Sequence, residues 1–123
     1  MPSYNAPVRD TRFVINEVLD LSSYASLPGF ESVTPDLVDT LVEEAGKFAS
    51  EVLAPLNPIG DKQGCTRHPD GSVTTPPGFK EAYQQFQQAG WGSISMPTEF
   101  GGQGLPHVLG FVVEEFVDAA NIG

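Results

Sequence analysis

Cysteine is almost absent from this sequence, and basic residues are few. The single cysteine, Cys65, excludes a disulfide within the chain and a zinc site built from several cysteines. Six lysine and arginine residues stand against sixteen aspartate and glutamate residues, so the formal net charge is −10. Because this charge repels nucleic-acid phosphates and anionic lipid head groups, we expect no nucleic-acid partner and no membrane partner.

Long apolar runs are also missing. No stretch approaches the roughly 20 residues of a membrane-spanning helix. Residues 1–5 do not open a basic region followed by an apolar stretch, as a secretory signal would. With 40% hydrophobic residues, the chain can nevertheless bury a core, which a disordered segment cannot. We therefore expect a folded, soluble and cytoplasmic protein.

Helical spacing of apolar residues is the main signal in the chain. It predicts four amphipathic helices, over residues 8–21, 34–55, 79–89 and 105–120. The second is the clearest, because Thr34 is a good N-cap and Pro35 stands at the first helical position. Pro55 is expected to end it, with Pro58 close behind.

The fourth helix is the most apolar. Apolar residues cover about half of its circumference, so it needs neighbours on more than one side. We expect its broad face, with Val112, Val113 and Phe116, to contact parts of a longer protein, whereas Phe111 lies on the polar side. The chain stops soon afterwards, at Gly123, without a cap or polar tail, which favours a piece of a longer protein. Alone, such a piece is expected to self-associate through its second or fourth helix.

The segment over residues 57–78 shows no sustained periodicity. It is rich in proline and glycine and contains the turn dipeptide Asp70-Gly71, so it predicts an irregular loop. No strand pattern is evident. The fold class predicted from the sequence is therefore all-α, a small bundle of about four helices with a long irregular loop near 57–78.

A glycine-rich stretch, Gly101-Gly102-Gln103-Gly104, precedes the fourth helix and invites interpretation as a phosphate-binding loop. It lacks the Lys-Ser/Thr pair of a P-loop, and no strand precedes it as in a dinucleotide-binding motif. We interpret it as a tight turn that redirects the chain into the helix.

Isolated titratable residues do not assemble a reaction centre. His68 and His107 have no second ligand at metal-binding spacing, and we expect His68 at the surface. Arg67 lies near Cys65 in the sequence, but no base or oxyanion site accompanies this thiol.

Two acidic pairs have an equally plain interpretation. Glu114 and Glu115 are adjacent on a helix, so they point about 100° apart and cannot form an acid–base couple on one face. Glu43 and Glu44 are read in the same way, as a solvated or inter-domain face. No catalytic, cofactor-binding or metal-binding residue is assigned in this chain.

Residues 89–106 form the most distinctive passage of the sequence. Residues 89–106, AGWGSISMPTEFGGQGLP, resemble the GW-x-x-I-x-x-P-x-E-[YF]-GG-x-G passage of acyl-CoA dehydrogenases, between two helices of their amino-terminal domain. Residues 112–116, VVEEF, look like the next helix of that family, and residues 51–57, EVLAPLN, resemble the end of its first main helix. Residues 4–19 are similar to the extra amino-terminal segment of a larger bacterial subgroup.

This resemblance implies an organisation and an activity. Residues 1–33 would be an amino-terminal extension with a short helix, and residues 34–123 the helical domain, followed in family members by a β-barrel and a helical bundle. The resemblance implies FAD as cofactor, an acyl-CoA substrate, an electron-acceptor flavoprotein as partner and a homo-oligomer. The groups that bind FAD and remove the α proton match no residue here, so the chain alone is expected to be inactive. The helices would then form a wall of the acyl site.

Two other interpretations stay open. The chain could be an independent helical interaction module that shares this domain, without catalysis. It could also be a helical scaffold without any relation to acyl-CoA, which requires the match over residues 91–106 to be accidental.

Overall fold

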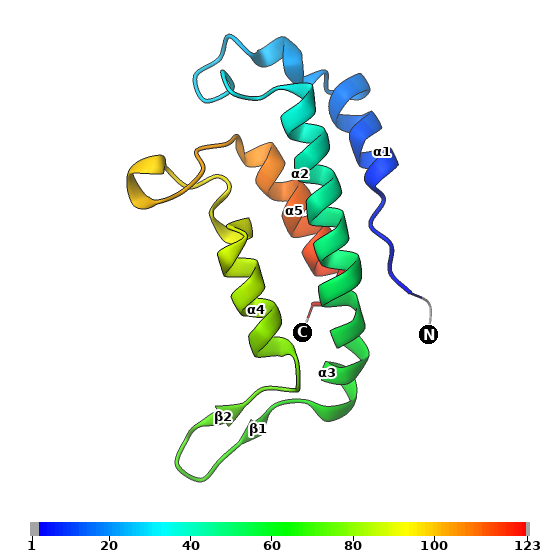
Figure 1. Ribbon diagram of the computed structural model, residues 1–123, viewed down its shortest axis with the longest axis vertical. Coiled ribbons are helices and arrows are strands. Elements are labelled where there is room, and N and C mark those ends of the chain that lie inside the picture. The colour runs from blue at the N-terminus through cyan, green and yellow to red at the C-terminus, as the bar shows by residue number, and fades with distance from the viewer. Residues whose placement is uncertain (1–2, 123) are drawn as a thin grey trace.

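A computed structural model describes residues 3–122. Its helices are α1 (Val8–Phe13), α2 (Pro35–Phe48), α3 (Asn57–Gln63), α4 (Phe79–Gln88) and α5 (His107–Ala120). The strands β1 (Thr66–Arg67) and β2 (Val73–Thr74) form a small antiparallel hairpin. The predicted all-α fold is confirmed (Figure 1). Within residues 3–122, every helix is too short or too polar to span a bilayer.

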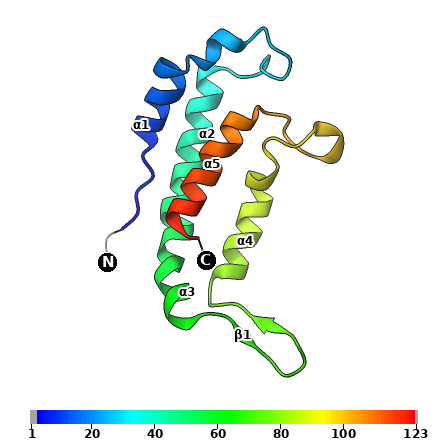
Figure 2. The same cartoon turned by 180° about the vertical axis from the view of Figure 1, so that it is seen from behind.

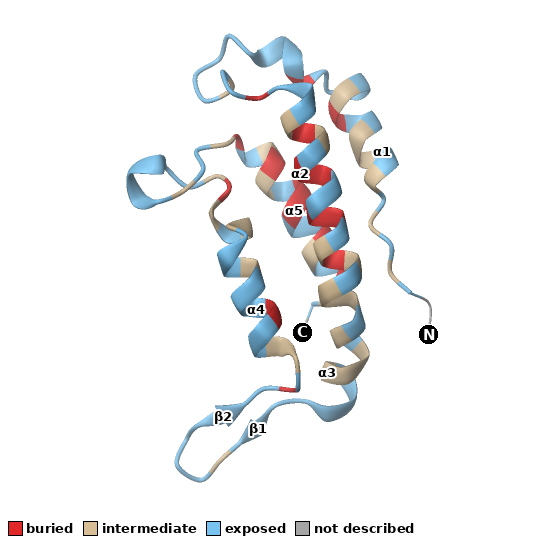
Figure 3. Ribbon diagram, viewed as in Figure 1, coloured by how far each residue is buried: buried red, intermediate tan, exposed pale blue. Residues whose placement is uncertain are grey.

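Helices α2 and α5 lie side by side at the centre of the molecule (Figures 1 and 2). Thr34 caps α2 as predicted, because its Oγ1 accepts a hydrogen bond from the N–H of Leu37 at 3.2 Å. The core lies along this pair, as the buried residues in Figure 3 show. The largest fully buried side chains are those of Phe116, Ile15, Ile94, Leu109, Val38 and Val42.

The broad apolar face of α5 is buried inside the chain itself. Phe116 is 0% exposed and Val113 is 3% exposed, whereas Phe111 is 65% exposed on the polar side, as predicted. The expectation that this face contacts other parts of a longer protein is therefore wrong for these residues. Because α2 and the turn Trp91–Ser93 both contact α5, the helix already has neighbours on more than one side. For the same reason, the core-facing sides of α2 and α5 do not offer a surface for self-association.

The N-terminal segment contributes to the same core. Helix α1 continues through a π-helical turn, Val14–Val18, so the first predicted helix is confirmed as far as Val18. It ends before Asp20, which takes a left-handed conformation with φ 46°. Its position beside α2 brings Ile15 to 2% exposure, and Leu21 and Val33 are buried as well.

The predicted end of α2 and the predicted loop both need correction. The helical path does not stop at Pro55: it passes through a π-helical turn, Ala49–Leu53, and a 3-10 turn into α3. Proline has no backbone N–H to donate to the carbonyl four residues earlier in an α-helix, and its ring clashes with that carbonyl. Rewinding the chain places Pro55 and Pro58 early in new helical segments, where proline is tolerated. Thus residues 57–78 contain α3 and the β1–β2 hairpin.

Helix α4 follows its prediction closely, and Gly90 after it has φ 78°. Aromatic contacts help to join this part of the chain to the bundle. The ring of Phe48 on α2 lies 6.2 Å from that of Phe86 on α4 and 6.3 Å from that of Trp91, between centroids. Grooves lie along α4, lined in part by Phe86.

Candidate functional site

The loop between α4 and α5 is closed by hydrogen bonds of its own backbone. The amides of Gly102, Gln103, Gly104 and Leu105 donate to the carbonyls of Pro97, Ser93, Met96 and Ile94 respectively, at 2.9–3.1 Å. Ile94 beneath the loop is 2% exposed, so the loop is anchored in the core. The hydrogen bonds and the buried Ile94 therefore fix the shape of the loop without a bound ligand.

Glycine is required at several positions of this loop. A Cβ on Gly102 would collide with the carbonyl of Met96, so no side chain fits there. Gly101 and Gly104 have φ of 84° and 66°, a region that glycine enters at little cost. The stretch is thus the tight turn that the sequence predicted. Because the amides of residues 102–105 donate inside the loop, they are not available to cradle a phosphate.

A groove of about 670 Å³ lies between this loop, α4 and α5. Its floor is mainly apolar, and its lining includes Phe86, Trp91, Ile94, Met96, Val113 and Val117. His107, Glu114 and Asp118 also line it, and all three are exposed. Such a groove fits apolar groups and repels anions at its edge. No ion pair or hydrogen bond within residues 3–122 turns these three groups into a catalytic set.

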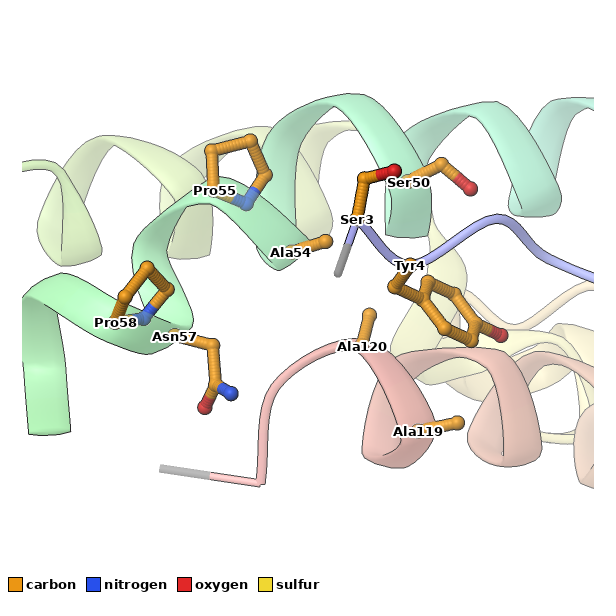
Figure 4. Close-up of a pocket in the computed structure, with 9 residues that line it drawn as sticks. All are labelled: Ser3, Tyr4, Ser50, Ala54, Pro55, Asn57, Pro58, Ala119 and Ala120. Carbon is orange, nitrogen blue, oxygen red and sulfur yellow. The ribbon is translucent and has the colours of Figure 1, made fainter. Parts of the chain in front are cut away.

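A second hollow lies where the N-terminal segment crosses the end of α5 (Figure 4). Ser3 and Tyr4 line it from one side, Ser50 and Ala54 from the continuation of α2, and Ala120 from α5. The Ser50 hydroxyl already accepts the N–H of Ala6 at 3.0 Å, so it is not poised as a nucleophile. Burial, followed by the nearby charge of Glu115, raises the pKa of the Tyr4 phenol, which keeps it neutral and unsuited to act as a base.

The isolated residues named from the sequence remain apart. His68 lies in the hairpin, where its Nε2 is 2.6 Å from Thr74 Oγ1, and His107 begins α5 far along the chain. Cys65 is exposed. Among residues 3–122, no group of three or more histidine, cysteine, aspartate or glutamate residues could hold a metal ion.

One polar cluster was not foreseen. Arg12 on α1 binds Glu43 on α2, with Nη2 to Oε2 at 3.0 Å, and donates to the main-chain carbonyl of Asp39 at the same distance. Hydrogen bonds from Arg12 and Lys47 lower the pKa of the Glu43 carboxyl. The hydrogen bonds that Lys47 donates to Glu44 and Glu43 raise the pKa of Lys47. Glu43 therefore joins two helices. The sequence shows that one face of α2 is acidic, but it does not show that Arg12 of α1 lies against that face.

Comparisons with known proteins show two related dehydrogenases. No protein-family model matches the chain. It is 40% identical over 120 residues to the 3-methylmercaptopropionyl-CoA dehydrogenase of Ruegeria pomeroyi, and 26% identical over 122 residues to the broad-specificity linear acyl-CoA dehydrogenase FadE5 of Mycobacterium tuberculosis. Each match covers 98% of this chain and 20% of the relative. Both relatives are acyl-CoA dehydrogenases, and the chain spans about one fifth of their length, which is consistent with a segment of a protein of that family.

Proposed function

We propose that the chain is the amino-terminal helical part of an FAD-dependent acyl-CoA dehydrogenase. The parent enzyme would oxidise the α,β bond of an acyl-CoA thioester and pass the electrons to an acceptor flavoprotein. The observation that carries this proposal is 40% identity to a dehydrogenase over 98% of the chain. Residues 1–33 would form the extension and residues 34–123 the helical domain.

Within that enzyme, the segment would serve as a wall. Its buried α2–α5 core and its closed glycine loop give a rigid surface, and rigid walls exclude water from a reaction site. Electrostatic interactions strengthen in such an environment. The segment would contribute shape rather than a reacting group, and we expect the isolated chain to be inactive.

The glycine loop and the groove beside it do not suit the pyrophosphate of FAD. The pyrophosphate of FAD is an anion that needs free amides or cations, whereas amides 102–105 are bonded within the loop. The groove beside them presents carboxylates at Glu114 and Asp118. We therefore propose that FAD is held by the rest of the parent, and we assign it no residue in this chain. The same acidity disfavours the phosphates of CoA.

The test compares the full-length gene product with the 123-residue chain. Both are assayed for bound flavin and for oxidation of acyl-CoA thioesters of several chain lengths with a dye as electron acceptor. We expect activity and flavin in the full-length protein alone. A full-length protein without either would refute the proposal and favour a helical scaffold or interaction module that shares the fold.

A further inference from the structure

The outer side of the N-terminal segment carries a concentration of exposed apolar side chains. Six of the twelve exposed large apolar side chains in residues 3–122 lie between positions 13 and 27. Three belong to α1 and the π-helical turn after it: Phe13 is 59% exposed, Val14 44% and Val18 63%. We name Phe13, Val14 and Val18 the α1 face. Exposed apolar clusters on soluble proteins mark interaction sites.

Side chains on the inner side of this segment hold the α1 face in place. Ile15 is 2% exposed in the core, and Arg12 binds the Asp39 carbonyl and Glu43 of α2. With these residues turned inward, the α1 face cannot rotate into the core. Val14 and Val18 are four residues apart and lie on one side of the segment. The turn is π-helical, closed by Leu19 N–H to the Val14 carbonyl at 2.8 Å, and such turns occur frequently at functional sites.

The charged residues around the α1 face indicate which kind of surface can cover it. Asp10 precedes Val14 by one turn and Glu17 follows Phe13 by one turn; both are exposed, and neither forms an ion pair within residues 3–122. Arg9 lies one turn before Phe13, so the edge is mixed but mainly acidic. A second copy of the chain also has a net charge of −10 and the same acidic residues beside its α1 face, so the two copies would repel each other. The occupant should therefore be apolar and carry lysine or arginine beside its apolar residues.

The relatives indicate where this occupant resides. The match to the Ruegeria enzyme covers 120 of 123 residues, which leaves three unaligned and so includes nearly all of the N-terminal segment. That enzyme has about four fifths of its length outside the matched part. We propose that the α1 face is a docking surface for another part of the same polypeptide, apolar and edged by basic residues. This rests on the proposed function only in requiring a parent of that length.

Thiol labelling of the full-length protein tests the proposal. Val18→Cys is compared with Val73→Cys, because Val73 on the hairpin is 57% exposed and offers the same substitution at similar exposure. Both are treated with iodoacetamide, and labelling is measured peptide by peptide by mass spectrometry. We expect Cys at position 18 to react about tenfold more slowly than at position 73, because it must wait for local opening. Equal rates would overturn the proposal.

Two further arms identify the occupant. Slow labelling at position 18 should be independent of protein concentration; a rate that rises on dilution would mean that a second copy covers the face, contrary to the proposal. Adding Glu17→Lys should speed labelling severalfold by repelling basic groups, whereas the control Glu81→Lys on α4 should not. An unchanged labelling rate with Glu17→Lys would refute the proposal that basic residues of the covering surface lie beside Glu17.

Flavin content is measured on the same samples. Protection at position 18 without flavin would refute the proposed function and leave the docking surface standing. Rapid labelling in a flavin-containing enzyme would refute the docking surface alone.

Discussion

Gly46 lies in α2 where the N-terminal segment crosses it, and adding one methyl group there tests that contact. A Cβ at position 46 would lie 2.6 Å from Val8 Cγ2 and 3.2 Å from Ala6 Cβ. Overpacking of this kind costs about 1–3 kcal/mol. Alanine, however, is favoured over glycine inside a helix by about 1 kcal/mol. Gly46→Ala should therefore lower the free energy of unfolding by about 0–2 kcal/mol.

The effect should change sign when Val8 is shortened. With Val8→Ala, the closest contact disappears, and Gly46→Ala should then raise the free energy of unfolding by up to about 1 kcal/mol. The two substitutions are thus expected to couple by about 1–3 kcal/mol. Urea unfolding of the wild type, both single variants and the double variant measures this coupling. Val73→Ala on the distant hairpin is the control, because its effect should simply add to that of Gly46→Ala.

Additive effects of Gly46→Ala and Val8→Ala would contradict the structure. That result would mean that the N-terminal segment does not rest on α2 in solution. It would also remove the basis for treating the α1 face as a fixed surface.

Three other substitutions test separate parts of the fold. Phe116→Ala should cost about 3–5 kcal/mol of unfolding free energy because the ring is fully buried, whereas Phe111→Ala, at 65% exposure, should change it by less than about 0.5 kcal/mol; equal losses in urea unfolding would refute the orientation of α5. Gly102→Ala should open the loop before α5, seen as faster amide exchange of residues 102–105, because its methyl group would collide with a loop carbonyl; unchanged exchange would contradict that geometry. Glu43 has a lowered pKa because of Arg12, so its stabilising effect is present above the ordinary glutamate pKa and is lost as the pH falls through the lowered value. Glu43→Gln should lower the urea midpoint at neutral pH and reduce the loss of stability on acidification; parallel pH profiles would refute the link.

Periodicity and capping predicted the positions of α1, α2, α4 and α5, but not α3. Thr34 and Pro35 fixed the start of α2, and Gly90 marked the end of α4, because these signals act through neighbouring backbone groups. The glycine turn before α5 was also predictable, since Gly101 and Gly104 occupy backbone conformations that other residues avoid.

Features that depend on distant partners were not predictable. Pro55 normally ends a helix, but here the chain rewinds and continues into α3. The hairpin strands have two residues each, too short for any periodicity. The broad face of α5 suggested an outside partner, because the sequence does not reveal that α2 and the Trp91 turn cover it together. Arg12 likewise gains its role only from the docking of α1 on α2.

In the proposed function, this segment is part of a flavin enzyme that oxidises acyl-CoA thioesters. The most direct test of this proposal is the visible spectrum of the purified full-length protein, recorded without oxygen before and after addition of acyl-CoA thioesters of several lengths. We predict a bound flavin whose absorbance is bleached by at least one thioester. A protein without flavin, or a bound flavin that no thioester in the series reduces, would refute the proposed function.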